Sequence, residues 1–289
     1  MRNGFFKGHA LGNDYLVMDP RELDFRLAPE NVRAICDRHT GIGADGILVP
    51  RESSKAAFGL TIWNPDGTTA EKSGNGLRIF ALWLHATRRT RRTELTVETA
   101  GGIVRISLHT DRHGEASRAT VEMGEAIFRA ATLPCTIDVD ELVEQPLEVL
   151  GRNLRFTGVN LGNPHCVLFR SKGEEWTAEE LRELGPVLAR HAIFPRGVNV
   201  QLAVPKGPRE LFLRIWERGA GETRASGSSA CAAAAAGVRL GLVKSPVTVQ
   251  SAGGSLQVTV DSAFRVTLHG SVEEVARGRF SSSFLRRLR

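Results

Sequence analysis

Two short segments of the chain each place a serine and glycines at the start of an expected helix. They read AEKSGNGLR at residues 70–78 and RASGSSA at residues 224–230. The first amides of a helix have no partner within it and carry the positive end of its dipole, so glycines there let a carboxylate or phosphate approach the backbone. Serine is also a favoured helix cap, which gives Ser73 and Ser226 a purely structural interpretation. One such loop favours the cap, whereas two loops at equivalent positions favour a shared ligand cleft.

A cleft with two opposed proton-transfer groups suits the inversion of a carbon centre. One group removes a proton from one face and the other delivers a proton to the opposite face, so each must act as acid or base near neutral pH. A cysteine thiol can do so, because its ordinary pKa of about 8.5 falls further at a helix N-terminus. A serine hydroxyl is a far weaker acid and needs an adjacent base. The expected geometry suits inversion, while two hydroxyls suit it poorly.

The chain also repeats itself. IWNPDGTTAEKSG from Ile62 resembles IWERGAGETRASG from Ile215, and LTVETAGGIVRISL from Leu95 resembles VTVQSAGGSLQVTV from Val247. The segments GNDYLVMD and GNPHCVLF form a further pair. All pairs share an offset of about 150 residues, which is the size of a domain rather than of a solenoid repeat. The chain is therefore interpreted as two homologous halves.

Each half contains short alternating strands joined by AGG hairpin turns, and one helix after its Ser-Gly pair. We expect an α+β fold of two homologous, pseudo-symmetric domains, each a mainly antiparallel sheet wrapped around a central helix. The second helix, SSACAAAAAGVRL, is nearly all small residues, which suits tight burial. We assign residues 1–127 plus about 271–289 to the N-terminal lobe and residues 128–270 to the C-terminal lobe, with the active site in the cleft between them.

The bulk composition fits a globular protein of 289 residues, since 42% are hydrophobic and 24% are charged. No apolar run approaches the roughly 18 residues that span a bilayer, and the N-terminus lacks the apolar core of a signal peptide. Four cysteines without CxxC spacing argue against a metal site and a disulfide framework, so we expect a cytoplasmic protein. The net charge is +6, but no nucleic-acid motif accompanies the basic runs, so we expect neither a nucleic-acid nor a membrane partner.

Several motifs, taken in order, resemble those of diaminopimelate epimerase, a cofactor-independent amino-acid epimerase of bacterial lysine and cell-wall synthesis. They are ALGNDY, TGIGADG, NPDG, GNPH, RGVNV and ERGAGET, and they run nearly end to end. Each motif alone is weak, but their order and spacing together are specific. The resemblance implies epimerisation of LL-2,6-diaminopimelate to the meso form by a two-base mechanism, without pyridoxal phosphate, other cofactor or metal, in a homodimer. In that family the positions of Ser73 and Ser226 are both cysteine.

The resemblance also implies roles for individual residues. The catalytic positions would be Ser73 and Ser226, with Glu217 and His165 tuning their acidity. The carboxylate at the reacting carbon would be held by Gly74, Asn75, Gly227 and Ser228. The polar ends of the substrate would be bound by Asn13, Asn64, Asn163 and Asn199, with Glu217 receiving an ammonium group and Arg218 pairing with the distal carboxylate. Some members have a glutamine contact where this chain has Gly46.

Plainer interpretations exist for the same residues. Asn13 and Asn64 each suit the start of a turn, and His165 suits a core histidine with satisfied hydrogen bonds. Glu217 and Arg218 suit a surface ion pair that contributes little. The resemblance favours the functional interpretation for Asn64, Asn75, Asn163, Glu217 and Arg218, and leaves His165 evenly divided.

The paired serines have two explanations. In the first, which we favour, a parent protein has cysteine at both positions and this chain carries a double substitution, so that activity is strongly reduced while substrate binding persists. In the second the serines are native, which points to a very slow enzyme or to a non-catalytic amino-acid-binding homologue. A racemase of another amino acid, such as histidine, is the alternative within the family.

Overall fold

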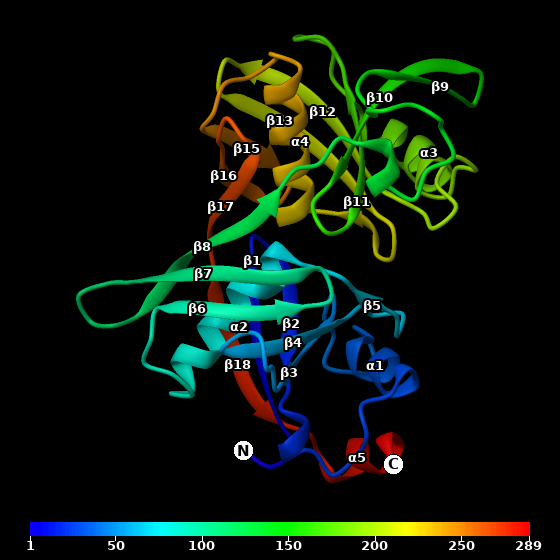
Figure 1. Ribbon diagram of the computed structural model, residues 1–289. Helices are drawn as coiled ribbons and strands as arrows, with labels where there is room; N and C mark the ends of the chain where they lie inside the picture. Colours follow the sequence, from blue (N-terminus) through cyan, green and yellow to red (C-terminus); the bar gives the residue numbers. More distant parts are fainter. The chain divides into compact units, whose positions relative to one another are not determined.

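The computed structural model describes residues 1–289, and the chain divides into two compact units (Figure 1). The first unit comprises Met1–Val121 and Gly270–Arg289, and the second comprises Glu122–His269. The chain leaves the first unit within β8 (Ala116–Glu125) and returns to it within β17 (Arg265–Ser271). Both units combine β-strands with a few helices, so the predicted α+β fold is confirmed.

The elements of the first unit surround one long buried helix. Its strands, besides part of β8, are β1 (Gly4–Ala10), β2 (Asn13–Val17), β3 (Ile47–Arg51), β4 (Phe58–Trp63), β5 (Thr69–Ala70), β6 (Glu94–Thr99), β7 (Gly102–Thr110) and β18 (Glu273–Arg279). Its helices are α1 (Pro29–Cys36), α2 (Gly74–Ala86) and α5 (Ser282–Leu288), with a 3-10 turn at Pro20–Glu22.

From β10 to β17, the second unit repeats the order of strands and α-helices that runs from β1 to β8 in the first. Its strands, besides parts of β8 and β17, are β9 (Gln145–Val149), β10 (Arg152–Asn160), β11 (Pro164–Phe169), β12 (Asn199–Gly207), β13 (Glu210–Glu217), β14 (Gly221–Thr223), β15 (Val247–Ser251) and β16 (Gly254–Val260). Its helices are α3 (Ala178–Ala189) and α4 (Gly227–Arg239), with a 3-10 turn at Ala130–Thr132.

Strand pairing is mainly antiparallel, as predicted, but each unit contains two parallel pairs. In the first unit β2 pairs with β3 and β4 pairs with β6, and in the second β11 pairs with β12 and β13 pairs with β15. A parallel pair needs a crossover connection, and here the crossovers carry α1, α2, α3 and α4 in turn. The two central helices are thus the crossovers of βαβ units, which is why each begins where a strand and its polar loop end.

The central helices are buried along most of their length but filled differently. In α2 every residue from Gly74 to Leu84 is buried, and Phe80 stacks on Trp83 with ring centroids 5.5 Å apart. In α4 every residue from Gly227 to Gly237 is buried, and the run consists of glycine, serine, alanine and one cysteine. A Cβ added at Gly237 would lie 2.9 Å from Cγ2 of Val243, so the neighbouring chain leaves no room for larger side chains there.

None of the helices combines the length and the apolar character that a bilayer crossing requires. No group of three or more histidine, cysteine, aspartate or glutamate side chains is arranged to hold a metal ion.

The packing of α4 predicts a large cost for added volume. Replacing the fully buried Ala234 by leucine should lower the free energy of unfolding by about 1–3 kcal/mol, because the extra carbons must displace close-packed neighbours. Urea denaturation measures the change. The matched control is Ala178→Leu in the first turn of α3, where the half-buried side chain has room and a change below about 0.5 kcal/mol is expected. Equal losses at the two positions would contradict tight packing of α4.

Candidate active site

Both serines cap the helix that follows them. Ser73 has extended backbone angles (φ −140°, ψ 115°), and its Oγ accepts a hydrogen bond from the Gly76 amide at 3.0 Å. Ser226 has nearly the same angles (φ −142°, ψ 124°), and its Oγ accepts from the Ser229 amide at 3.4 Å. Each hydroxyl thus satisfies one of the amides that the helix itself leaves unpaired. The structural interpretation of both serines is correct, and it leaves the helix dipole available for an anion.

A chain of side-chain amides lies behind the start of α2. Asn75 donates from Nδ2 to Oδ1 of Asn13 at 2.9 Å, and Arg78 donates from Nη2 to Oδ1 of Asn75 at 2.8 Å. Asn13 in turn donates from Nδ2 to Oδ2 of Asp45 at 2.8 Å. All of these residues except Asp45 are buried. The structure therefore brings Ser73, Gly74, Asn75 and Asn13 together, and it fixes the orientation of both asparagines.

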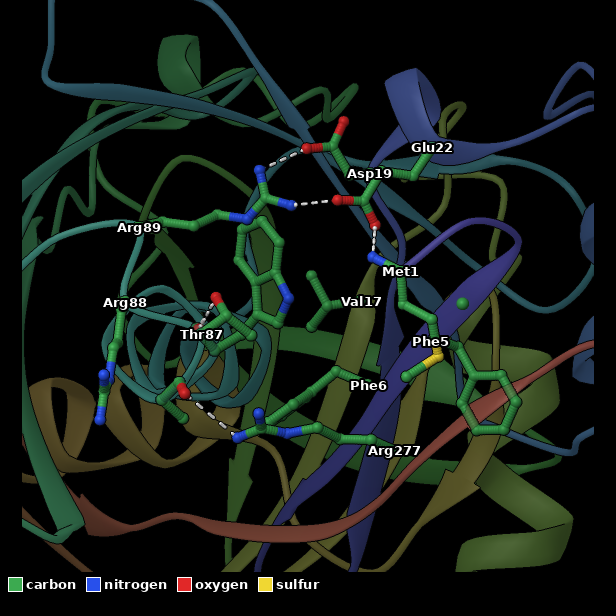
Figure 2. A pocket seen from close by; sticks show the side chains of 13 residues that line it. Met1, Phe5, Phe6, Val17, Asp19, Glu22, Thr87, Arg88, Arg89 and Arg277 are labelled. Carbon is green, nitrogen blue, oxygen red and sulfur yellow. Dashed lines mark hydrogen bonds and ion pairs between the residues drawn. The ribbon is translucent and has the colours of Figure 1, made fainter.

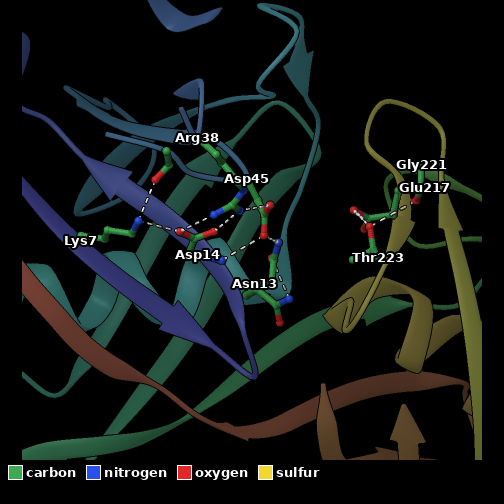
Figure 3. Close-up of polar contacts among 10 residues, drawn as sticks. Lys7, Asn13, Asp14, Arg38, Asp45, Glu217, Gly221 and Thr223 are labelled. Carbon is green, nitrogen blue, oxygen red and sulfur yellow. Dashed lines mark hydrogen bonds and ion pairs between the residues drawn. The ribbon is translucent and has the colours of Figure 1, made fainter. Parts of the chain in front are cut away.

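An ionic cluster anchors this chain of amides (Figure 3). Arg38 donates to Oδ1 of Asp14 at 2.7 Å and to Oδ1 of Asp45 at 2.6 Å, while Nζ of Lys7 lies 3.0 Å from Oδ2 of Asp14. Burial raises the pKa of Asp14, but the hydrogen bonds from Arg38 and Lys7 outweigh it and leave this pKa below its usual value. Sequence reasoning missed the cluster, although Asp14 and Asp45 both stand inside quoted motifs.

In the second unit, the hydrogen-bond network beside the start of α4 consists of neutral groups. His165 is fully buried. Nδ1 of His165 lies 3.0 Å from Nε2 of Gln201, and Nε2 of His165 lies 2.9 Å from Oδ1 of Asn163. Because the Gln201 amide nitrogen can only donate, Nδ1 accepts and the ring proton is on Nε2. Asn163 then donates to Oγ of Ser228 at 3.4 Å, and Gln201 also donates to Oγ of Ser229 at 2.9 Å.

This network keeps the imidazole uncharged. Burial lowers the pKa of His165 to about 3, with a smaller lowering from the positive charge of Arg218 and an opposing effect of the Gln201 hydrogen bond. The neutral ring carries no net charge, and its two nitrogens contact Asn163 and Gln201. Gln201 was missed, yet a glutamine within the apolar run VNVQLAV is a recognisable signal for a buried polar contact.

Two further expected residues are joined at the end of β13. The Arg218 amide donates to Oδ1 of Asn199 at 3.0 Å, and Asn199 donates from Nδ2 to the Pro164 carbonyl at 3.0 Å. Half-buried Glu217 accepts from Oγ1 of Thr223 at 3.3 Å (Figure 3). The Arg218 side chain passes close over Gly197, where an added Cβ would lie 3.0 Å from its Cδ.

Asn64 and Gly46 make local contacts within the first unit. Asn64 donates from Nδ2 to Oγ1 of Thr68 at 2.9 Å and its amide donates to the Thr68 carbonyl at 2.8 Å, so it does start a turn. A Cβ added at Gly46 would lie 2.3 Å from the Trp63 carbonyl oxygen and 2.7 Å from Cε1 of Tyr15. No glutamine contact can therefore form at position 46 without a shift of the backbone.

The chain is similar to known proteins in both sequence and fold. The family model described as diaminopimelate epimerase matches residues 5–129 and 157–275. Diaminopimelate epimerase 2 of Nostoc is 40% identical over 279 residues, which cover 96% of this chain and 95% of that protein. The chain belongs to the diaminopimelate epimerase family. Diaminopimelate epimerase of Leptospira biflexa is 36% identical over 279 residues, which cover 96% of this chain and 99% of that protein.

Solved structures of more distant proteins share the fold of this family member. A hydroxyproline epimerase of Agrobacterium vitis superposes with a TM-score of 0.71 at 16% identity, covering 95% of this chain and 91% of its own. A phenazine biosynthesis protein of Bacillus anthracis superposes with a TM-score of 0.65 at 14% identity, and the match covers 96% of this chain and 98% of that protein. At such low identity the likeness shows the two-domain α+β fold alone. The family resemblance and the fold predicted from the sequence are both confirmed.

Three surface cavities are lined by residues other than those expected for this family. Within the first unit, a cavity of about 670 Å³ is lined by Arg89, Asp19 and Glu22 among others, with Arg89 2.6 Å from Asp19 (Figure 2). A second cavity of about 580 Å³ shares Arg89, and one of about 560 Å³ in the second unit is lined by Trp176 and Arg170. None of the three is lined by an expected site residue.

The neutral state of His165 predicts a pH dependence of stability. The unfolded imidazole titrates near about 6.5, whereas the folded one stays neutral down to about pH 3, so between these values the unfolded state binds more protons. The free energy of unfolding should therefore fall with acidification by up to about 1.4 kcal/mol per pH unit from this residue. His165→Gln should remove that part of the slope in urea titrations between about pH 6.5 and 4.5. The exposed control His113→Gln should leave the slope unchanged, and an unaltered slope in His165→Gln would contradict the assignment.

Proposed function

We propose that the chain binds LL-2,6-diaminopimelate and interconverts it with the meso form, positions 73 and 226 acting on opposite faces of one α-carbon. The observation that carries the proposal is the closely similar cap geometry of Ser73 and Ser226 at two buried helices, in a member of the diaminopimelate epimerase family. A duplicated helix start is what a two-base inversion requires, because each face of the carbon needs its own proton-transfer position.

The helix starts supply binding for the substrate carboxylate in this proposal. The first-turn amides at Gly74 and Asn75 of α2, and at Gly227 and Ser228 of α4, have no i−4 carbonyl within their helix. Amides and the positive end of a dipole stabilise a carboxylate, and they stabilise still better the enediolate that forms when the α-proton leaves. The buried amide network of each unit holds these donors rigid, so little reorganisation accompanies the reaction.

The distal end of the substrate would be read by groups of both signs. Arg218 suits the distal carboxylate and Glu217 suits an ammonium group, since both are half-buried near the end of β13 and its following loop. Asn64, Asn163 and Asn199 would add neutral hydrogen bonds. Asn13 is held by Asn75 and Asp45, which supports a role in orienting Asn75 as well as in binding.

Serine at both positions weakens the proposed chemistry. The Ser226 hydroxyl accepts only from the Ser229 amide, and no carboxylate or imidazole contacts either serine. Cys36 and Cys166 offer no replacement, because both are buried, and burial raises the pKa of Cys36 to about 12 and raises that of Cys166 as well. We therefore expect binding to persist and turnover to be strongly reduced. The same absence of a base favours the alternative of an amino-acid-binding homologue with native serines.

We also propose that the chain works as a homodimer in the cytoplasm. The homodimer rests on the family resemblance. The compartment is supported by four free cysteines, of which Cys36, Cys166 and Cys231 are buried.

Restoring thiols tests the proposed function. The double variant Ser73→Cys/Ser226→Cys should increase deuterium exchange at the α-carbon of LL-diaminopimelate, and its epimerisation, by roughly 10²–10⁴-fold, because thiols titrate within reach of neutral pH. The single variant Ser73→Cys should stay slow in inversion, since the Ser226 face still lacks its base. Nuclear magnetic resonance in deuterated buffer measures both processes.

Matched measurements separate the alternatives. Ser107→Cys on β7 adds a thiol where the native hydroxyl only contacts Glu94, and it should leave the rates unchanged. Tight calorimetric binding of diaminopimelate with no exchange in the double variant would support the binding homologue instead. Exchange of another amino acid, with none of diaminopimelate, would identify a sister racemase.

A further inference from the structure

The phenol of Tyr15 lies beside one of the two proposed proton-transfer positions. Tyr15 is in the middle of β2, its side chain is buried, and its hydroxyl oxygen is 3.3 Å from Oγ of Ser73. The Gly76 amide already donates to that Oγ, so the Ser73 proton is free to point at the phenol oxygen. Residue 15 therefore contributes an ionisable group in contact with Ser73.

The ring of Tyr15 is held in place by a glycine. A Cβ added at Gly46 would lie 2.7 Å from Cε1 and 3.1 Å from Cδ1 of the ring, so this side of the ring packs directly against Gly46. The same backbone accepts a hydrogen bond from the Leu16 amide at 3.1 Å. The position of the phenol next to Ser73 is thus set by a β-strand contact and not by a flexible loop.

The corresponding position of the second unit does something else. When GNDYLVMD is aligned with GNPHCVLF, His165 is the residue equivalent to Tyr15. Both ring nitrogens of His165 are used by Asn163 and Gln201, and Ser226 has only the Ser229 amide as a partner. One serine has a phenol as a proton partner, and the other has none.

We propose that Tyr15 relays protons to and from Ser73, so that this chain exchanges the substrate α-proton mainly from the Ser73 side and with retention of configuration, while inversion to the meso form stays slow. This inference rests on the proposed function, and it specifies which face of the α-carbon exchanges its proton. Tyr15 acts through Ser73 and is a positioning and relay residue, while Ser73 is the group that faces the substrate.

The proton transfer balances without any further reactant. With the phenol ionised, the Ser73 hydroxyl proton passes to the phenolate oxygen as Ser73 Oγ takes the proton from the α-carbon. The carbon–hydrogen bond breaks, and its electron pair stays on the substrate as an enediolate. The phenol then trades its proton for a solvent deuteron, and the reverse transfer delivers deuterium to the same face. Inversion would need Ser226 to give up its proton and remain an alkoxide, which nothing there stabilises.

The relay predicts a particular pH profile. Phenols in water ionise near about 10, so the rate of exchange should rise about tenfold per pH unit above neutrality until the phenol is ionised. The chain contains a single tyrosine, so the ultraviolet absorbance of tyrosinate reports on Tyr15 alone. The midpoint of the absorbance titration and the break in the rate profile should coincide.

Spectroscopic titration tests the contact without any substrate. Ser73→Ala should raise the midpoint of the Tyr15 titration by roughly 0.5–1 pH unit, because the phenolate loses a hydrogen-bond donor. Ser226→Ala and the surface variant Ser107→Ala should leave it unchanged, with far-ultraviolet circular dichroism confirming that each variant stays folded. Equal midpoints for the chain and for Ser73→Ala would overturn the proposal, whatever the substrate proves to be.

Exchange measurements then test the relay itself. With diaminopimelate, deuterium incorporation with retention should exceed inversion at least tenfold, and Tyr15→Phe should reduce it at least tenfold while calorimetric affinity stays within about threefold. The combination Tyr15→Phe with Ser73→Ala should be no slower than Ser73→Ala alone. Retention that survives in Tyr15→Phe with an unchanged pH profile would overturn the relay. Absence of binding and exchange in the unmodified chain, with the titration behaving as expected, would overturn the proposed function and leave the Tyr15–Ser73 pair intact.

Discussion

The burial of two helix N-termini is the constraint on which this structure depends. An α-helix leaves its first amides unpaired, and burying them without partners costs free energy comparable to lost hydrogen bonds. The chain meets part of this cost with a serine cap at each helix, and a network of side-chain amides lies next to each cap. Donors that are buried, rigid and only partly satisfied are also what an anion binds best. The same arrangement therefore stabilises the fold and prepares a site.

The two units reach this result by different electrostatics. In the first, Asn13 is hydrogen-bonded to Asp45, and Asn75 is hydrogen-bonded to Arg78. Asp45 in turn belongs to an ionic cluster with Arg38, Asp14 and Lys7. In the second, Asn163 contacts Ser228 directly and is supported by a neutral histidine, which in turn contacts Gln201. A duplicated backbone has kept its helix start while the supporting side chains have diverged. Since a charged support and a neutral one respond differently to pH, the two helix starts need not have the same pH dependence.

Much of this could be predicted from the sequence, because its signals are local. Alternating strands, AGG hairpins, and a helix after each Ser-Gly pair all follow from short patterns, and the repeat gave the number of units. The parallel pairing of β2 with β3 could not be predicted, since alternation along one strand does not specify the direction of its partner. The link from Asp45 to Asn13 joins residues 32 apart in sequence, and no periodicity encodes it. Gln201 was within reach of sequence reasoning as a lone polar residue in an apolar strand.

The paired serines show how stability and chemistry can conflict at one position. A serine oxygen is a good acceptor for the amide of the first turn, and caps of this kind contribute about 1 kcal/mol each. A cysteine sulfur is a weak acceptor, so a thiol at the same place caps poorly but titrates near neutral pH. Serine at positions 73 and 226 therefore favours the folded helix at the expense of proton transfer. Position 73 retains a route to proton transfer because Tyr15 supplies an ionisable group that the cap itself lacks.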